Sequence, residues 1–263
     1  MSITWWIAPG EERRVEAAGL RDFEAVFRRA DLVAVKDALP ERQVHRWPME
    51  TGEPLFLKRQ FRCPGSEGAV SRARREKDAL LLLQNLNILA PRPVVMGEER
   101  RLGRVRRAFL ATEALPLTSN LEQALAGGLD GARRAALLRH VAGILKTMHG
   151  AGLNHRDFYL GHLFLMETQG KRGEAVAVLD LDRAQIRKTV PLRWRIKDLA
   201  ALLVSAPQGA ISPRERLRFF RAYLDGPLRD HRRWIELVER RVARTRARIA
   251  RRVAQGRANH HLP

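Results

Sequence analysis

The segment LNHRDFYLGHLFL, residues 153–165, places four side chains that exchange protons or hold anions within eight residues. They are His155, Arg156, Asp157 and His162. Such a group suits a catalytic loop, in which a carboxylate takes a proton while neighbouring cations hold negative charge. A solvated turn before a buried strand explains the same residues, because a chain with 42 arginines forms a His-Arg-Asp triplet easily. Other parts of the chain must decide between these interpretations.

Three further residues occur along the chain in an order that favours the catalytic interpretation of the triplet. Lys58 ends the apolar run LFLK, Glu76 lies 18 residues later in a stretch with helical spacing, and Asp180 ends the run AVLD that follows the triplet. Protein-kinase-like phosphotransferases have their lysine, helix glutamate, catalytic loop and metal-binding aspartate in this order. The order therefore predicts phosphoryl transfer.

The chemistry of phosphoryl transfer requires these residue types. ATP brings several negative charges, so a lysine such as Lys58 must hold the α- and β-phosphates and a helix carboxylate such as Glu76 must hold that lysine. Mg²⁺ prefers hard oxygen ligands, which Asp180 supplies at the end of a strand. Asp157 would orient the attacking hydroxyl and take its proton.

Simpler explanations exist for each residue taken alone. Lys58 could be a solvated strand residue, Glu76 could form a surface pair with Arg72, and Asp180 could cap a strand. That all of them fall in kinase order by coincidence is the weaker explanation.

The elements that must position these residues fall into two parts. The first reads as short strands with one helix, and the second is mainly helical, with an apolar strand that ends in acids. Strands are predicted at 31–38, 42–49, 53–60, 93–99, 107–115 and 174–186, and helices at 69–86, 120–128, 132–152, 195–206, 214–224 and 231–257. This pattern predicts an α+β fold of two lobes, with a small antiparallel-sheet N-lobe carrying one helix at 1–113 and a mainly helical C-lobe at 114–263. The kinase order of the residues above indicates that this fold is protein-kinase-like.

Three stretches, HRDFYLGHLFL, VLDLDRAQIR and RIKDLAALLVSA, together resemble the lipopolysaccharide heptose kinases of Gram-negative bacteria, the WaaP/InaA-type family. The resemblance lies in specific sequence motifs over about residues 145–206. Before them it rests only on the positions of single residues along the chain. It implies ATP-dependent phosphorylation, with Mg²⁺, of an inner-core sugar of lipopolysaccharide at the cytoplasmic face of the inner membrane.

The resemblance also implies roles for single residues. Asp157 would be the catalytic base, within the triplet that His155 and Arg156 complete. The other implied roles are nucleotide binding by Lys58 and Glu76, Mg²⁺ binding by Asp180, and bracing of the catalytic loop by Asp198 in KDLA.

The sequence departs from the protein-kinase pattern at two places. His162 stands where protein kinases have Asn, as it does in heptose kinases of this type. We expect His162 to contribute to cofactor binding, but a second metal is in doubt because imidazole is a poor Mg²⁺ ligand; a core histidine at the start of a strand is the alternative. No Gly-rich loop precedes Lys58, where only Gly52 lies in the expected turn, and PGSEG at 64–68 is the candidate substitute.

The charge is the unusual feature of the composition. Lys and Arg number 49 against 29 acids, giving +20, and only seven of the cations are lysines. Such a chain is attracted to polyanions. The segment 231–257 holds ten arginines and two acids beside a broken apolar stripe, so we expect a helix that packs on the C-lobe and also binds the anionic inner-membrane surface. The lack of a reading motif and the few aromatic residues argue against nucleic acid.

The remaining features of the sequence concern localisation. No apolar run approaches the roughly 20 residues of a membrane span, the N-terminus does not resemble a signal peptide, and the single Cys63 suits a reducing compartment. We therefore expect a cytoplasmic protein, and the resemblance implies that it is peripheral to the inner membrane, with the lipopolysaccharide core glycolipid as acceptor and heptose as its phosphorylated sugar. Kdo or a protein side chain remains an alternative acceptor, and a non-catalytic polyanion-binding module on a kinase fold is the alternative function.

Overall fold

The computed structural model describes residues 1–29, 32–36, 41–49, 53–63, 69–166 and 175–255. The chain divides into two compact units. The first comprises Met1–Pro116 with Asp180–Arg183, and the second comprises Leu117–Leu179 with Ala184–Pro263. Our predicted lobes placed Asp180 in the second lobe, whereas Asp180–Arg183 packs with the first unit, where its carboxylates meet basic side chains of that unit.

The first unit is built on a six-stranded antiparallel sheet of order β1-β5-β6-β4-β3-β2. Its strands are β1 (Ser2–Ile7), β2 (Val33–Lys36), β3 (Arg42–Trp47), β4 (Leu55–Gln60), β5 (Pro93–Arg101) and β6 (Arg104–Glu113). The first four residues of β4 alternate between buried and partly exposed, because successive side chains of a strand face opposite sides of the sheet. Lys58 therefore leaves β4 on the face opposite to Leu57, which lies in the apolar core.

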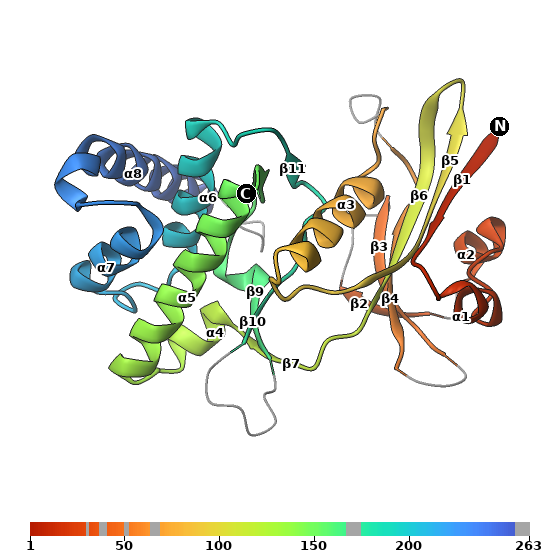
Figure 1. Ribbon diagram of the computed structural model, residues 1–263, viewed down its shortest axis with the longest axis horizontal. Helices are drawn as coiled ribbons and strands as arrows, with labels where there is room; N and C mark the ends of the chain where they lie inside the picture. Colours follow the sequence, from red (N-terminus) through yellow and green to blue (C-terminus); the bar gives the residue numbers. More distant parts are fainter. Residues whose placement is uncertain (30–31, 37–40, 50–52, 64–68, 167–174, 256–263) are drawn as a thin grey trace. The chain divides into compact units, whose positions relative to one another are not determined.

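Helices cover both faces of this sheet (Figure 1). They are α1 (Glu12–Ala17), α2 (Phe23–Arg28) and α3 (Arg72–Asn85). Phe23 and Phe27 of α2 pack with Phe109 of β6 in the main core cluster, while α3 packs on the other face. Ser71 caps α3 by accepting a hydrogen bond from the N–H of Arg74 at 2.9 Å.

The second unit is mainly helical. Its helices are α4 (Leu121–Ala126), α5 (Gly131–Gly150), α6 (Leu192–Ser205), α7 (Pro213–Tyr223) and α8 (Arg232–Ala254). Its short strands are β7 (Leu117–Asn120), β8 (Leu153–Asn154), β9 (Leu163–Met166), β10 (Val176–Val178) and β11 (Gln185–Ile186). Strands β10, β9 and β7 form one small sheet, and β11 pairs with β8 beside the segment that carries the triplet.

The predicted α+β class is confirmed, with several differences in detail. The strand β1 and the helices α1 and α2 were not predicted, and the strand predicted at 174–186 is interrupted, since β10 ends at Val178. The predicted C-terminal helix exists as α8, whose apolar stripe is buried at Val238 and Val242 but exposed at Val253. None of the described helices is both long enough and apolar enough to cross a bilayer.

Candidate active site

Lys58 lies between two carboxylates in the first unit. Its Nζ is 2.6 Å from Oε1 of Glu76 on α3 and 3.5 Å from Oδ1 of Asp180. Glu76 is buried, whereas the side chains of Lys58 and Asp180 are 29% and 34% exposed. The structure therefore brings together three predicted site residues that are far apart in the sequence. Glu76 is not the surface partner of Arg72 that the simpler explanation required.

Lys58 stays charged in this environment. Burial alone would lower the pKa of the Lys58 ammonium, but the negative charges of Glu76 and Asp180 outweigh burial and raise that pKa above its ordinary value. Burial raises the pKa of the Glu76 carboxyl, and the charge of Lys58 acts in the opposite sense. An ammonium with one exposed flank can bind the oxygens of a phosphate group.

The two acids that follow β10 have different partners. Asp182 is buried and accepts hydrogen bonds from the guanidinium groups of Arg42 and Arg72, the latter at 3.1 Å. Asp180 has a φ of 63°, a region that non-glycine residues seldom adopt, and this conformation turns the chain out of the strand direction. Asp182 is thus tied to arginines, whereas the carboxylate of Asp180 is the more exposed of the two.

A hard carboxylate oxygen on a partly exposed side chain fits a divalent cation such as Mg²⁺, and Asp180 offers one. Among the described residues, no three or more His, Cys, Asp or Glu side chains gather as a metal cluster. Gly52 and the segment 64–68, considered above as phosphate-binding elements, lie outside the described residues.

The predicted catalytic loop lies in the second unit and is fixed through its backbone. Asp198 on α6 is fully buried, and its Oδ2 and Oδ1 accept the N–H groups of His155 and Arg156, both at 2.8 Å. Its Oδ2 also lies 3.2 Å from Nε2 of His149. These bonds place Asp198 in contact with the loop, as expected of a bracing residue. They hold Arg156 at a φ of 73°.

Two histidines of the loop contact backbone carbonyl oxygens. His155 is buried and its Nε2 lies 3.0 Å from the carbonyl oxygen of Leu179, while Nδ1 of His162 lies 2.9 Å from the carbonyl oxygen of Asp157. A carbonyl oxygen only accepts, so each of these ring nitrogens carries a proton. The two rings stack with their centroids 6.0 Å apart. His162 therefore supports the loop that carries Asp157, a contact that its sequence position alone did not reveal.

One residue beside Asp157 was not predicted. Lys197 of α6 donates to the carbonyl oxygen of Arg156, and its Nζ is 3.4 Å from Oδ1 of Asp157. The scarcity of lysine in this chain was the available signal, and we applied it only to Lys58.

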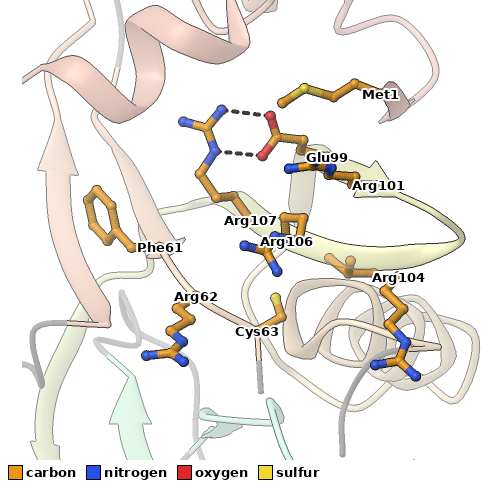
Figure 2. A pocket seen from close by; sticks show the side chains of 10 residues that line it. Met1, Phe61, Arg62, Cys63, Glu99, Arg101, Arg104, Arg106 and Arg107 are labelled. Carbon is orange, nitrogen blue, oxygen red and sulfur yellow. Dashed lines mark hydrogen bonds and ion pairs between the residues drawn. The ribbon is translucent and has the colours of Figure 1, made fainter. Parts of the chain in front are cut away.

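A basic cleft of about 730 Å³ opens elsewhere in the first unit (Figure 2). Its lining includes five arginines and one acid, Glu99, which Arg107 binds through two nitrogens at 2.7 and 2.8 Å. The other four are Arg62, Arg101, Arg104 and Arg106. They are exposed and have no carboxylate within ion-pair distance among the residues that the structure describes. Arg107 packs against Phe27 of α2, on the sheet face opposite to α3, so this cleft is separate from the Lys58 group.

Known proteins are similar to this chain in sequence and in fold. A model described as the lipopolysaccharide kinase (Kdo/WaaP) family matches residues 56–223, more than half of the chain. The lipopolysaccharide core heptose(I) kinase WaaP of Escherichia coli is 36% identical over 164 residues, which are 60% of this chain and 62% of that protein. The protein of the same name from Pseudomonas aeruginosa is 36% identical over 167 residues, which are 60% and 61% of the two chains. The matched region thus spans about three fifths of the length of these curated relatives.

A solved structure described as WaaP in complex with acyl carrier protein is similar over nearly the whole chain. The TM-score is 0.74 at 30% sequence identity, and the match covers 93% of this chain and 99% of that one. This similarity confirms the predicted fold class.

Proposed function

From the premise that the chain belongs to the lipopolysaccharide kinase (Kdo/WaaP) family, we propose that it transfers the γ-phosphoryl group of ATP to a sugar hydroxyl of the lipopolysaccharide inner core. A heptose is the proposed acceptor sugar, since the relatives that match are named for heptose(I). The reaction needs no covalent enzyme intermediate, because positioning and charge neutralisation supply most of the catalysis in phosphoryl transfer.

The observation that carries the proposal is the contact of Lys58 with both Glu76 and Asp180. A buried carboxylate fixes the ammonium from one side, and the partly exposed Asp180 lies on another. In the proposal, Lys58 binds oxygens of the α- and β-phosphates while Glu76 keeps it in place. Mg²⁺, when bound with Asp180 as ligand, would neutralise charge on the phosphate oxygens.

In the proposed step the acceptor oxygen forms a bond to the γ-phosphorus, and the bond from that phosphorus to the oxygen of the β-phosphate breaks, so ADP leaves. The hydroxyl proton passes to the carboxylate of Asp157. Asp198 holds the loop in this role through the N–H groups of His155 and Arg156, and His162 acts through its contact with the carbonyl oxygen of Asp157. The cofactor contact predicted for His162 remains a proposal.

The test is incubation of the chain with ATP, Mg²⁺ and a core glycolipid whose phosphates have been removed, followed by mass spectrometry of the sugar. We expect one phosphate on a heptose. A phosphate on Kdo or on protein would show that the chain is a kinase with a different acceptor. If no phosphate is transferred while the glycolipid still binds, the chain is a polyanion-binding module.

We also propose that the chain acts at the cytoplasmic face of the inner membrane, bound to its anionic surface through α8. The C-terminal part of α8 presents exposed arginines with few acids nearby. Each basic residue close to an anionic surface contributes about 1 kcal/mol of attraction, so a handful suffices.

Vesicle binding tests this location, with the basic cleft as a matched control. One variant changes four α8 arginines to Gln (Arg244, Arg248, Arg251 and Arg252), and the other changes the four cleft arginines. Both lose the same charge. We expect binding to anionic vesicles to fall much further in the α8 variant, and to disappear for the unaltered chain near 1 M salt, where the Debye length is about 3 Å. Equal losses in both variants would show attraction by net charge alone.

A further inference from the structure

Lys197 is the one lysine that contacts the catalytic loop among the described residues. It lies on α6 directly before Asp198, and its side chain is 20% exposed. The ammonium donates to the carbonyl oxygen of Arg156 and lies 3.4 Å from the carboxylate of Asp157, which is 12% exposed. One cation therefore meets both the backbone and the reactive side chain of the loop.

The contacts of α6 with Arg156 explain how the loop keeps an unfavourable backbone conformation. With a φ of 73°, Arg156 lies in the left-handed region, where a side chain crowds the backbone. Asp198 accepts the N–H of Arg156, and Lys197 donates to its carbonyl oxygen, so neighbouring residues hold the two ends of Arg156. The guanidinium of Arg156 also lies over the ring of Trp194, 5.0 Å from its centre.

The position of this clamp matters for Asp157. The carbonyl that Lys197 holds belongs to the peptide bond that leads into Asp157, so it sets the direction in which the Asp157 side chain leaves the backbone. An ammonium suits this task because its three N–H groups can serve two acceptors in different directions from one compact head. The planar guanidinium of arginine has a different donor geometry.

We infer that Lys197 is a positioning residue for phosphoryl transfer, which holds the Asp157 carboxylate in the orientation that receives the hydroxyl proton. The inference rests on the proposed function. It differs from a purely structural role, in which Lys197 would only stabilise the loop and leave turnover per folded molecule unchanged.

The first test is Lys197→Met, which keeps the unbranched apolar stem and removes the ammonium. We expect kcat to fall roughly 10- to 100-fold, as small misplacements of catalytic groups do. The KM values for ATP and acceptor should change less than about threefold, because Lys197 contacts neither in this proposal. Lys146→Met is the matched control, since Lys146 binds Asp225 on an exposed surface of the same unit. It should leave kcat unchanged.

Chemical rescue separates positioning from folding. In a Cys63→Ala background, Lys197→Cys provides the sole thiol, and 2-bromoethylamine converts it to an aminoethyl side chain that carries an ammonium. Modification should raise kcat well above that of the unmodified Lys197→Cys protein, toward that of the Cys63→Ala protein. Lys197→Arg, which keeps the charge and supports folding, should recover less.

The outcomes distinguish this inference from the proposed function. An unaltered chain that transfers no phosphate overturns the proposed function and the inference with it. An active chain whose Lys197→Met variant has normal kcat overturns the inference alone. Loss of kcat that follows the unfolded fraction, without rescue by the aminoethyl group, would also overturn it and assign Lys197 a structural role.

Discussion

The two groups of candidate site residues are held by different physical means. In the first unit, Lys58, Glu76 and Asp180 meet through their charged side chains alone. In the second, the triplet is held mainly through its backbone, whose N–H groups bind Asp198 and whose carbonyl binds Lys197. The first group depends on charge balance, and the second depends on the geometry of a constrained loop.

The difference predicts how each group responds to substitution. A change of charge at Lys58 leaves the two acids near it without their cation, so binding of phosphate groups should suffer. Changes at the loop should affect orientation and proton transfer instead, because the proposed base, Asp157, can be replaced while the backbone contacts keep the loop in shape. Substitutions of Asp157 and of Lys58 should therefore separate chemistry from binding.

The largest effect is expected for Asp157→Asn. The amide keeps the size of the side chain but cannot take the hydroxyl proton, so turnover should fall by about 10²–10⁴. Steady-state phosphorylation of the core glycolipid measures kcat, and nucleotide titration measures ATP affinity, which should stay within a few-fold of normal. Near-normal turnover would remove Asp157 from the catalytic role.

Lys58→Ala should cost roughly 10²–10³ in kcat/KM, comparable to the loss of one charge-stabilising donor in other active sites. Lys58→Arg should not restore it, since the broader guanidinium does not fit between Glu76 and Asp180 as the ammonium does. The nucleotide affinity of both variants is the readout that distinguishes this group from Asp157. Lys188→Ala, at an exposed position, is the control. Full activity of Lys58→Arg would make Lys58 an ordinary strand residue.

The group of Lys58, Glu76 and Asp180, which meet through their charges, was the easier one to predict from sequence. Lys58 directly follows the apolar run Leu55–Leu57 of β4, and Glu76 lies on the next helix along the chain. Packing of α3 on the sheet was then sufficient to bring Glu76 to Lys58. The sequence order also identified Asp157 and Asp180 as residues of interest, although their roles remain proposals.

The geometry of the loop could not be predicted in the same way. Contacts such as that of Lys197 with Asp157 join residues 40 positions apart and depend on where α6 lies in the folded unit. The φ angles of Arg156 and Asp180 result from tertiary bonds and run against local preference. The helices α1 and α2 were missed for another reason, because six residues are too few to show a helical period.

Asp198→Asn tests whether the Asp198 carboxylate holds the loop in its conformation. The amide retains one acceptor oxygen but turns an NH₂ group toward a buried donor, so we expect the free energy of unfolding to fall by roughly 2–4 kcal/mol. Urea unfolding of the variant measures the loss. Asp130→Asn is the matched control, since Asp130 also accepts two backbone N–H groups but at the exposed start of α5. A loss below about 1 kcal/mol at Asp198 would mean that the loop keeps its shape without this carboxylate.

The last effect concerns the charge balance of the first unit, and it is lost in acid. Glu98 of β5 is fully buried; burial alone would raise the pKa of its carboxyl, but hydrogen bonds from Arg74, Ser71 and Arg100 lower that pKa to about 2. A carboxyl whose pKa is lower in the folded state stabilises the fold fully above its unfolded pKa of 4.5, and this contribution is lost as the pH falls toward 2.

At 1.36 kcal/mol per pKa unit, the contribution of Glu98 that is lost in this window is about 3 kcal/mol. Glu98→Gln lacks the titrating group, so its stability should be lower than that of the unaltered chain at pH 6, and the gap should narrow steadily between pH 4.5 and 2. Glu215 of the second unit also has a pKa of about 2, because hydrogen bonds from Ser212 and Arg134 outweigh burial, so Glu215→Gln serves as the matched variant. Urea unfolding at each pH measures both gaps. A gap for Glu98→Gln that stays constant down to pH 2 would show that Glu98 stabilises the unit by packing and not by its charge.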